Sequence, residues 1–186
     1  MEEERIVRIS RFLGKHLRHQ PQRLCLTLEP GGWVAVDDLL AACARHGIPL
    51  SREELDEVVA RNDKRRFAFD EMGERIRANQ GHSVEVDLQL MPVTPPATLY
   101  HGTSRATVDA ILRQGLRKMR RHHVHLSADI STAIKVGRRH GPPMVFAVAA
   151  GAMSADGYAF FRSENGVWLT DVVASRYLRL LEASHG

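Results

Sequence analysis

The segment LMPVTPPATLYHG, residues 90 to 102, divides the chain more clearly than any other part of the sequence. Three of the eight prolines, Pro92, Pro95 and Pro96, lie close together in it. Proline has a fixed φ and no backbone N–H, so this stretch favours an extended connection over a helix or a central strand. We therefore expect a proline-rich linker at 91–97, with one lobe at 1–90 and another at 98–186.

Helical periodicity dominates the beginning of the first lobe. Residues 3–18 place apolar side chains at the spacing of one helix face, and Asp37 precedes a second apolar helix that ends at Gly47. Ser51 and Glu54 have the spacing of a capping box, which predicts a third helix over about 52–61. The apolar positions of the first helix are Ile6, Ile9, Leu13 and Leu17.

Strand patterns accompany these three helices. PGG at 30–32 indicates a turn before the short strand WVAV, and RRFAFDEMGERIRAN reads as two strands around a turn at 72–74. Three helices followed by a hairpin predict a winged-helix-like lobe, which is a common nucleic-acid-binding module.

The second lobe has more strand patterns. TLYHG reads as a strand that runs into a glycine turn, and a helix follows it, capped by Thr103 or Ser104 and ended by Gly115. HVHLS is a short alternating strand, and DISTAIKVGRRHG is a helix closed by glycine. Further strands are expected in MVFAVAAGAM, YAFFRSENG, VWLTDVV and YLRLLE. The predicted class is α+β, and no GxGxxG follows the first strand, so a Rossmann site is unsupported.

Composition excludes several classes of protein. Apolar residues make up 44% and charged residues 26%, which is ordinary for a globular chain, and no apolar run approaches the roughly 20 residues that span a bilayer. The start, MEEERIVRIS, lacks the chemistry of a signal peptide. Cys25 and Cys43 form no CxxC pair, so we expect small buried thiols in a reduced, cytoplasmic protein. Nothing in the sequence suggests an obligate dimer, and we expect a monomer.

Charge is distributed unevenly between the two halves. Residues 1–90 contain 14 Lys and Arg against 16 Asp and Glu, a net of −2, whereas residues 91–186 contain 12 against 6, a net of +6. A basic half of globular composition suggests a polyanionic partner such as a nucleic acid or a dinucleotide, with a solvated basic face as the alternative.

The most concentrated basic stretch is KMRRHHVHLS, residues 118 to 127, and its three histidines raise the question of zinc. In a strand only His123 and His125 would share a face, because His122 points the other way. No cysteine lies nearby, so a tetrahedral site would lack ligands. No metal is predicted here, and basic side chains flanking an edge strand remain the alternative to a ligand site.

Other basic motifs are spread along the chain. GKHLRHQP ends the first helix, where cations can also be explained by their favourable interaction with the helix dipole. NDKRRF and VGRRHG each contain two adjacent arginines. Arginine forks match phosphate geometry, so arginines converging from separate segments suggest phosphate recognition. YHGTS, residues 100 to 104, allows either close backbone approach to a ligand or a tight turn with a helix cap, and NG in SENGVWL predicts a hairpin turn.

These motifs occur together in a known order. KHLRH, GGWVAVDDLL, NDKRRF, IRANQGHS, LYHGTS, GLRKMRRHHVHLS, VGRRHG and SENGVWLT resemble the RNA 2′-phosphotransferase family (Tpt1/KptA) from about residue 10 to residue 180. The resemblance implies a winged-helix-like lobe followed by a small ADP-ribosyltransferase-like lobe that binds NAD⁺. It implies a transferase that removes an internal 2′-phosphate from RNA, as on spliced tRNA, and needs no metal. The implied products are 2′-OH RNA, nicotinamide and ADP-ribose 1″,2″-cyclic phosphate.

The resemblance also implies site residues. Its catalytic group matches Arg18, His19, Arg66 and Arg139, with neighbouring Arg65 and Arg138 as the second choice in each arginine pair. The positions matching the NAD⁺ site are His101, Gly102, Thr103, His125, Ser127, Asn165 and Val167. Phosphates of RNA or NAD⁺ would be met by Lys64, Arg65, Arg120, Arg121, His122 and His123.

Two alternatives remain open from sequence. A non-catalytic RNA-binding module would need neither His101 nor the adjacent glycine. An enzyme of the same fold could ADP-ribosylate RNA ends, DNA ends or protein, because the nucleophile does not come from the enzyme.

Overall fold

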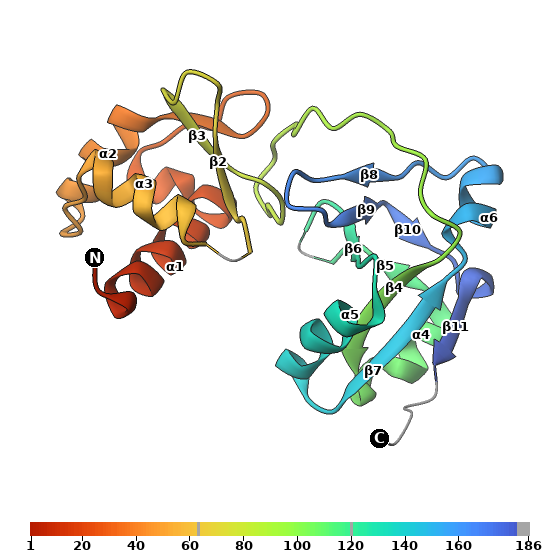
Figure 1. Ribbon diagram of the computed structural model, residues 1–186. Coiled ribbons are helices and arrows are strands. Elements are labelled where there is room, and N and C mark those ends of the chain that lie inside the picture. The colour runs from red at the N-terminus through yellow and green to blue at the C-terminus, as the bar shows by residue number, and fades with distance from the viewer. Residues whose placement is uncertain (63, 120, 182–186) are drawn as a thin grey trace. The chain divides into compact units, whose positions relative to one another are not determined.

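The computed structural model describes residues 1–62, 64–119 and 121–181 and shows a mixed α/β protein with helices and small antiparallel sheets (Figure 1). The chain divides into two compact units, Met1–Leu90 and Met91–Gly186. The proline-rich segment is held by the second unit, because the Val93 N–H donates to the Phe160 carbonyl at 2.8 Å. None of the helices in the described ranges has the length and apolar character needed to cross a bilayer.

Three helices build most of the first unit. Helix α1 spans Glu3–His19 and buries the predicted face of Ile6, Ile9, Leu13 and Leu17. Helix α2 spans Val36–Arg45, so Asp37 lies in its first turn and does not precede it as predicted. Helix α3 spans Arg52–Ala60 behind the predicted capping box of Ser51. A short 3₁₀ turn, η1, covers Pro21–Leu24. The periodicity and the capping box therefore predicted these helices correctly.

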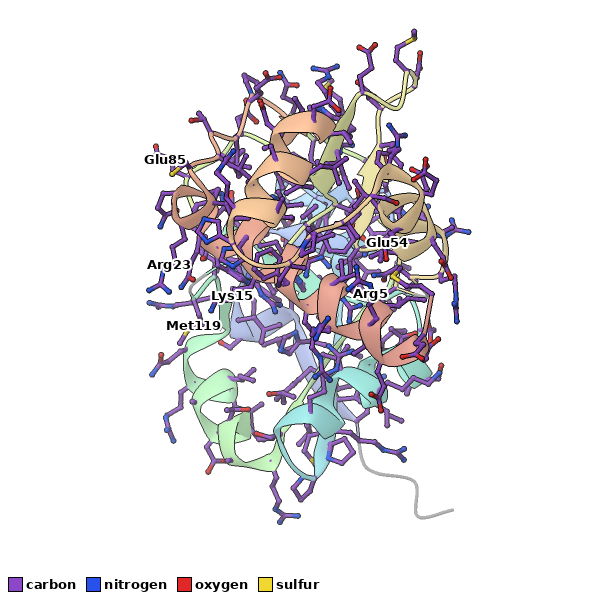
Figure 2. The ribbon with its side chains drawn as sticks, turned by 90° about the vertical axis from the view of Figure 1, so that its left-hand side faces the viewer. Arg5, Lys15, Arg23, Glu54, Glu85 and Met119 are labelled. Carbon is purple, nitrogen blue, oxygen red and sulfur yellow. The ribbon has the colours of Figure 1, made fainter. Side chains whose placement is uncertain are left out.

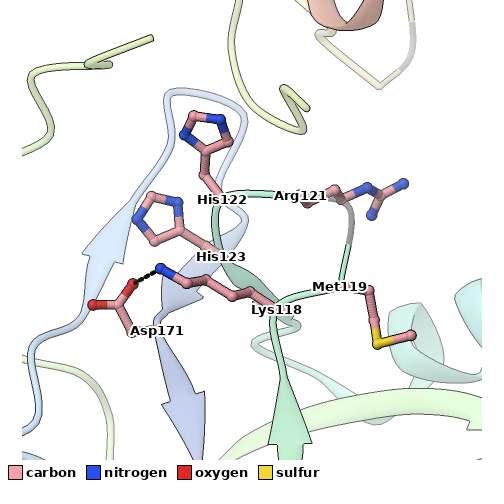
Figure 3. Close-up of a pocket in the computed structure, with 6 residues that line it drawn as sticks. All are labelled: Lys118, Met119, Arg121, His122, His123 and Asp171. Carbon is pink, nitrogen blue, oxygen red and sulfur yellow. Dashed lines mark ion pairs between the residues drawn. The ribbon is translucent and has the colours of Figure 1, made fainter. Parts of the chain in front are cut away.

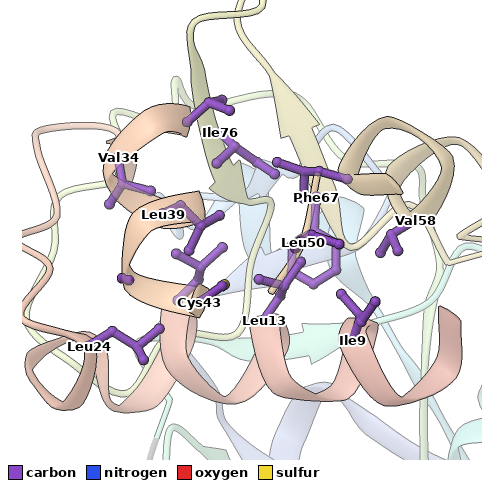
Figure 4. Close-up of a cluster of buried hydrophobic side chains, with 14 of the residues drawn as sticks. Ile9, Leu13, Leu24, Val34, Leu39, Cys43, Leu50, Val58, Phe67 and Ile76 are labelled. Atoms are coloured by element: carbon purple, nitrogen blue, oxygen red, sulfur yellow. The ribbon is translucent and has the colours of Figure 1, made fainter. Parts of the chain in front are cut away.

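A three-stranded antiparallel sheet completes the first unit. Strands β1 (Trp33–Ala35), β2 (Phe67–Phe69) and β3 (Arg75–Ala78) lie in the order β1-β3-β2. The β2–β3 hairpin turns at the predicted place, with Gly73 at φ 72°. Figure 4 shows the core between sheet and helices, where Leu13 and Ile9 of α1 lie below Leu39 of α2 and Phe67 of β2.

The second unit contains three small antiparallel sheets. One has the order β11-β7-β4, from Leu178–Leu181, Pro143–Val148 and Leu99–Ser104. Another has the order β6-β9-β8, from Val124–Leu126, Trp168–Thr170 and Phe161–Arg162, and β10 (Val172–Val173) pairs with β5 (Leu116–Arg117). Backbone hydrogen bonds between Tyr100 and Ser127, at 2.9 and 2.7 Å, join β4 to the segment after β6.

Helices connect these strands. Helix α4 is Val108–Gln114, α5 is Ile130–Gly137 and α6 is Ala150–Ala155. The 3₁₀ turns η2, η3 and η4 cover Arg105–Thr107, Arg138–His140 and Ser175–Tyr177. Helix α5 begins at a cap, where the Asp129 carboxylate accepts the Thr132 N–H at 2.8 Å, and it packs on β4 and β7.

Several sequence predictions for this unit are wrong. Strand β4 does not turn at Gly102 but continues to Ser104, because Gly102 pairs with Val145 in the sheet. Thr103 and Ser104 therefore do not cap α4, which begins only at Val108. Residues 150–153, the end of the expected strand MVFAVAAGAM, belong instead to helix α6, in accord with the three alanines of that helix.

Two further expectations also need correction. Cys25 is exposed rather than buried, at the end of η1 with φ 55°, whereas Cys43 is buried. His122 and His123 precede β6 instead of lying within it, so only His125 belongs to the strand.

Candidate phosphate and nucleotide site

In the first unit, the end of α1 meets the loop that leads into β2. The Arg18 Nη2 donates to the Arg66 carbonyl at 3.5 Å, although the two residues lie 48 positions apart. Both side chains are half-buried. The sequence predicted that these arginines come from separate motifs, and the fold brings them together within this unit.

The 62–66 loop is held in place by two asparagines. Asn62 is buried; its Nδ2 donates to Ser10 Oγ at 2.9 Å, and its Oδ1 accepts the Arg66 N–H and Nη1 at 3.4 Å each. The Asn79 N–H donates to the Arg66 carbonyl at 2.9 Å, and its Nδ2 donates to the Arg65 carbonyl at 2.7 Å. These contacts hold Arg65 at the rare φ of 40°.

Sequence reasoning missed the positioning role of Asn62 and Asn79. Both lie inside the quoted motifs NDKRRF and IRANQGHS, so the signal was the presence of an asparagine beside each basic or strand segment. A buried amide satisfies several backbone groups of an irregular loop at once. Next to these contacts Lys64 and Arg65 are exposed, whereas Arg66 is half-buried.

His19 is the exposed last residue of α1. Its Nδ1 lies 2.8 Å from Ser83 Oγ, and the Ser83 N–H donates to the Arg18 carbonyl at 2.9 Å. Segment 82–84 therefore closes the end of α1 and orients the imidazole. Ser83 is a second positioning residue that sequence reasoning did not single out.

In the second unit, the predicted histidines of β4 and β6 lie together. The Nδ1 of His101 contacts the His125 carbonyl at 3.0 Å, and because a carbonyl only accepts, Nδ1 carries the proton. Burial lowers the pKa of His101, and the bond to the His125 carbonyl opposes this only in part. His101 is therefore neutral at pH 7 and has Nε2 as an acceptor.

One arginine contacts these histidines, and a second arginine from another segment acts on the first. The Arg121 Nη1 donates to His125 Nδ1 at 3.2 Å. The pKa of Arg121 is lowered, first by desolvation and second by the positive charge of Arg139, although the guanidinium stays charged at pH 7. Arg139 lies on η3, where it and Arg138 are exposed. Like charges held this close favour an anionic ligand.

A cavity of about 500 Å³ lies beside this group (Figure 3). One ion pair crosses it, between Lys118 Nζ and Asp171 Oδ1 at 3.6 Å. The pKa of His123 is lowered, chiefly by burial. The cavity is lined by one carboxylate and mostly basic side chains, which suits a phosphorylated ligand. The lining residues are Lys118, Met119, Arg121, His122, His123 and Asp171. Arg120, also predicted to contact phosphate, lies outside the described residues.

Gly102 and Thr103 of the predicted nucleotide site have structural partners. A Cβ on Gly102 would lie 1.7 Å from the Ala133 carbonyl oxygen, so glycine allows α5 to pack against β4. Thr103 Oγ1 is 2.5 Å from Thr107 Oγ1, and both Gly102 and Thr103 are buried.

Asn165 and Val167 lie in the turn between β8 and β9, where Gly166 has φ 80°. The Ser163 hydroxyl donates to Asn165 Oδ1 at 2.7 Å and accepts the Val167 N–H at 3.1 Å. The NG hairpin prediction is therefore confirmed. Both residues are half-buried, and Ser127 is half-buried beside Tyr100.

The described residues contain no group of three or more His, Cys, Asp and Glu side chains that could hold a metal ion. The polar groups gathered in each unit are arginines, lysines and histidines on irregular segments. Fold and site together define a mixed α/β protein that is suited to phosphorylated ligands.

Comparison with known proteins identifies the family. A sequence model described as "RNA 2'-phosphotransferase, Tpt1 / KptA family" matches residues 4–172. Proteins named "Probable RNA 2'-phosphotransferase" are similar throughout. The one from Trichormus variabilis is 60% identical over 97% of this chain and 100% of its own. The one from Streptomyces griseus is 57% identical over 97% of this chain and 99% of its own. The chain belongs to the RNA 2′-phosphotransferase family and is a transferase.

Proposed function

We propose that this protein removes an internal 2′-phosphate from RNA, as on spliced tRNA, with NAD⁺ as the co-substrate. The observation that carries the proposal is the gathering of the family-matching side chains within each unit. Arg18 contacts Arg66 in the first unit, and Arg121 links His125 to the neighbourhood of Arg139 in the second. Family membership supplies the reaction class.

The first unit would serve as a winged-helix-like lobe that binds RNA. Its element order, with α1, α2 and α3 followed by the β2–β3 hairpin and β1 at the sheet edge, supports this assignment. The second unit would be the ADP-ribosyltransferase-like lobe. Its support is the junction of β4 and β6, which brings two histidines and two arginines from separate segments together.

The residues of the second unit fit NAD⁺. A neutral His101, oriented by the His125 carbonyl, offers Nε2 as an acceptor for a ribose hydroxyl. The cavity lined by Lys118, Arg121 and His122 offers cations for the phosphates of the dinucleotide. Bound NAD⁺ supplies an electrophilic ribose carbon with nicotinamide as its leaving group.

In this proposal Arg18 and Arg66 hold the 2′-phosphate, with Lys64 as a supporting contact, and Arg139 is the catalytic arginine of the second unit. The phosphate is already an anion, so no protein base is needed to create the nucleophile. The arginines orient one phosphate oxygen toward the ribose carbon; the new C–O bond forms as the bond to nicotinamide breaks. The neighbouring hydroxyl of the ADP-ribosyl ribose then attacks phosphorus, and the bond from phosphorus to the RNA 2′-oxygen breaks. The RNA leaves with a 2′-OH, and the phosphate stays on ADP-ribose as the 1″,2″-cyclic phosphate.

The second step places more charge around phosphorus, so it depends more on the three arginines. His19 would transfer the proton in that step. Its position at the end of α1, fixed through Ser83, next to Arg18, supports this role. No metal is assigned to either step, because arginines supply the charge stabilisation.

The decisive experiment incubates the protein with NAD⁺ and an oligonucleotide that carries one internal 2′-phosphate. We expect stoichiometric nicotinamide, 2′-OH RNA and ADP-ribose 1″,2″-cyclic phosphate. Binding of RNA without nicotinamide release would instead identify a non-catalytic RNA-binding module. Nicotinamide release with ADP-ribose retained on an RNA end, a DNA end or a protein would identify a different acceptor.

A further inference from the structure

The outer face of α1 carries two cations, Arg11 and Lys15, that have no carboxylate partner among the described residues of the first unit. Arg11, Lys15 and Arg18 follow one another at spacings of four and three residues, so they share one helix face over about 10 Å. Arg11 and Lys15 are exposed. Within the described part of the chain, neither forms an ion pair or a side-chain hydrogen bond.

Other arginines in this unit have carboxylate partners. Arg5 binds Glu54 at 2.9 Å, Arg61 binds Glu57 at 2.8 Å and Arg52 binds Asp56 at 2.9 Å. Figure 2 shows Arg5 and Glu54 at one end of α1, with Lys15 toward the other. The unit therefore contains many acidic groups, yet among the described residues none forms an ion pair with Arg11 or Lys15. Glu3, which lines the same groove as Arg11, pairs with Arg61 instead.

The local sequence strengthens this contrast. The positions one turn before and after Arg11 are Val7, Arg8, Gly14 and Lys15, and those around Lys15 are Arg11, Phe12, Arg18 and His19. Like charges one helical turn apart destabilise a helix. A row of cations with that cost is expected where an anionic ligand compensates it.

A groove of about 230 Å³ connects this row to the 62–66 loop. Arg11 lines it together with Lys64 and Arg66, and the buried Asn62–Ser10 hydrogen bond lies among its lining residues. At its other end the row reaches Arg66 directly, through the contact between Arg18 Nη2 and the Arg66 carbonyl. The groove and the row are therefore continuous with the place where Arg18 and Arg66 meet.

We propose that this groove and the α1 row bind the RNA backbone next to the 2′-phosphate, and that Arg11 and Lys15 each contact a backbone phosphate. The proposal rests on the function proposed above, in which Arg18 and Arg66 hold the 2′-phosphate. The length of the row corresponds to about three nucleotides, at roughly 3.4 Å of axis per nucleotide in one strand. Single-stranded RNA with a few nucleotides on one side of the modified residue is the ligand that fits.

The test compares two substrates: a 2′-phosphorylated dinucleotide, and a 2′-phosphorylated oligonucleotide extended on both sides. The variant is Arg11→Gln with Lys15→Gln, since glutamine keeps the helix. The matched control is Arg113→Gln with Arg179→Gln, which removes the same charge from exposed positions of the second unit. For the oligonucleotide the groove variant raises KM about tenfold, the loss of two exposed charge-assisted contacts. For the dinucleotide KM stays unchanged.

Salt dependence gives a second readout. The slope of log affinity against log salt for the oligonucleotide becomes shallower by about 0.7 for each lost contact in the groove variant. Equal loss on both substrates, no loss on the oligonucleotide, or an equal loss in the control variant would each overturn the proposal.

A third measurement separates this proposal from the proposed function. Fluorescence anisotropy of single-stranded RNA without a 2′-phosphate reports groove binding directly and needs no turnover. In one outcome the wild-type protein releases no nicotinamide, while the groove variant still binds this RNA about tenfold more weakly than the control. That result would contradict the proposed reaction and support RNA binding in the groove. Equal RNA affinity of groove variant and control counts against the groove whatever the activity.

Discussion

At the residue scale, Arg66 and Arg139 differ from their neighbours Arg65 and Arg138 in how each is held. Arg66 is half-buried and bonded to Asn62 Oδ1, whereas Arg65 is exposed. Arg139 is close enough to Arg121 to lower the pKa of that guanidinium. Both observations support our proposal that Arg66 and Arg139 are the members of each pair that act on the phosphate.

We predict that Arg66→Ala and Arg139→Ala each slow the second chemical step by about 10²–10³-fold, because they remove charge stabilisation from a crowded phosphorus centre. The ADP-ribosylated RNA intermediate should then accumulate. Lysine at either position should restore activity only in part, since it lacks the bidentate fork. A time course on labelled RNA with the intermediate resolved on a gel measures this, with Arg65→Ala and Arg138→Ala as controls. Slow substrate loss without intermediate in both variants would assign these arginines to binding or to the first step.

His101 makes a pH prediction at the same scale. Burial lowers the pKa of its imidazole in the folded protein, while the unfolded imidazole titrates near about 6.5. Below that pH the imidazole binds a proton in the unfolded chain but stays neutral in the folded protein. Protonation therefore favours the unfolded state, and the free energy of unfolding falls as the pH drops toward the folded pKa. Above the unfolded pKa the imidazole is neutral in both states, so the full stability of the folded protein is present.

Urea unfolding of wild type and His101→Asn between pH 7.5 and 5 should measure this difference. Asparagine retains a donor for the His125 carbonyl but does not titrate. Other histidines titrate in both proteins, so the difference isolates His101. The advantage of the wild type should shrink as the pH falls, and a constant or growing advantage would contradict the assignment of a depressed pKa.

At the element scale, the contact between β4 and α5 depends on two glycines. A Cβ on Gly102 would lie 1.7 Å from the Ala133 carbonyl, and one on Gly137 would lie 2.6 Å from the Thr103 carbonyl. Neither position has a positive φ. Space, and not backbone conformation, therefore excludes side chains here, and this contact supports the strand that carries His101.

We predict that Gly102→Ala lowers the free energy of unfolding by about 3 kcal/mol or more, because the clash is with backbone atoms. Gly47→Ala is the matched control: Gly47 has φ 74° and nothing within 4 Å of an added Cβ, so strain alone costs about 1–2 kcal/mol. Urea denaturation compares the two. A smaller loss at Gly102 than at Gly47 would show that α5 moves away from β4 at little cost.

At the scale of the whole molecule, each unit has its own buried core. The first cluster, around Leu13 and Leu39, lies entirely within 1–90, and the second, around Leu99 and Phe160, lies entirely within 91–186. A unit with a separate buried core is expected to fold by itself.

We therefore predict that a fragment of residues 1–90 unfolds cooperatively in urea. Leu13→Ala should destabilise it by about 2–5 kcal/mol, since the side chain is fully buried. Val7→Ala, at a position that is 39% exposed on the same helix, should change stability by less than about 1 kcal/mol. A non-cooperative transition, or equal effects of the two substitutions, would show that the fragment lacks the native core.

The complete protein also makes a prediction about metals. Since charge stabilisation is assigned to arginines, activity on 2′-phosphorylated RNA should persist in excess EDTA. Added Mg²⁺ or Zn²⁺ should not raise the rate. Loss of activity in the chelator that one specific metal reverses would require a metal in the reaction.

Much of the first unit could be predicted from sequence because its signals are local. Ile6, Ile9, Leu13 and Leu17 recur at helical spacing, and all are buried in α1. The Ser51–Glu54 box and Gly73 mark the start of a helix and the turn of a hairpin through contacts within a few residues. The candidate arginines and histidines were found by motif resemblance, because the order of motifs can be read from the sequence without knowledge of the fold.

By itself, the sequence determined the family, the helices of the first unit and the basic motifs. Only the tertiary structure decided that β4 runs through Gly102, that Asn62 and Asn79 hold the 62–66 loop, and that His101 donates to the His125 carbonyl. The physical reason is the range of the interactions. Helix periodicity and caps act within one or two turns, whereas strand pairing, buried amide contacts and the pKa of a buried imidazole depend on partners brought close by the fold.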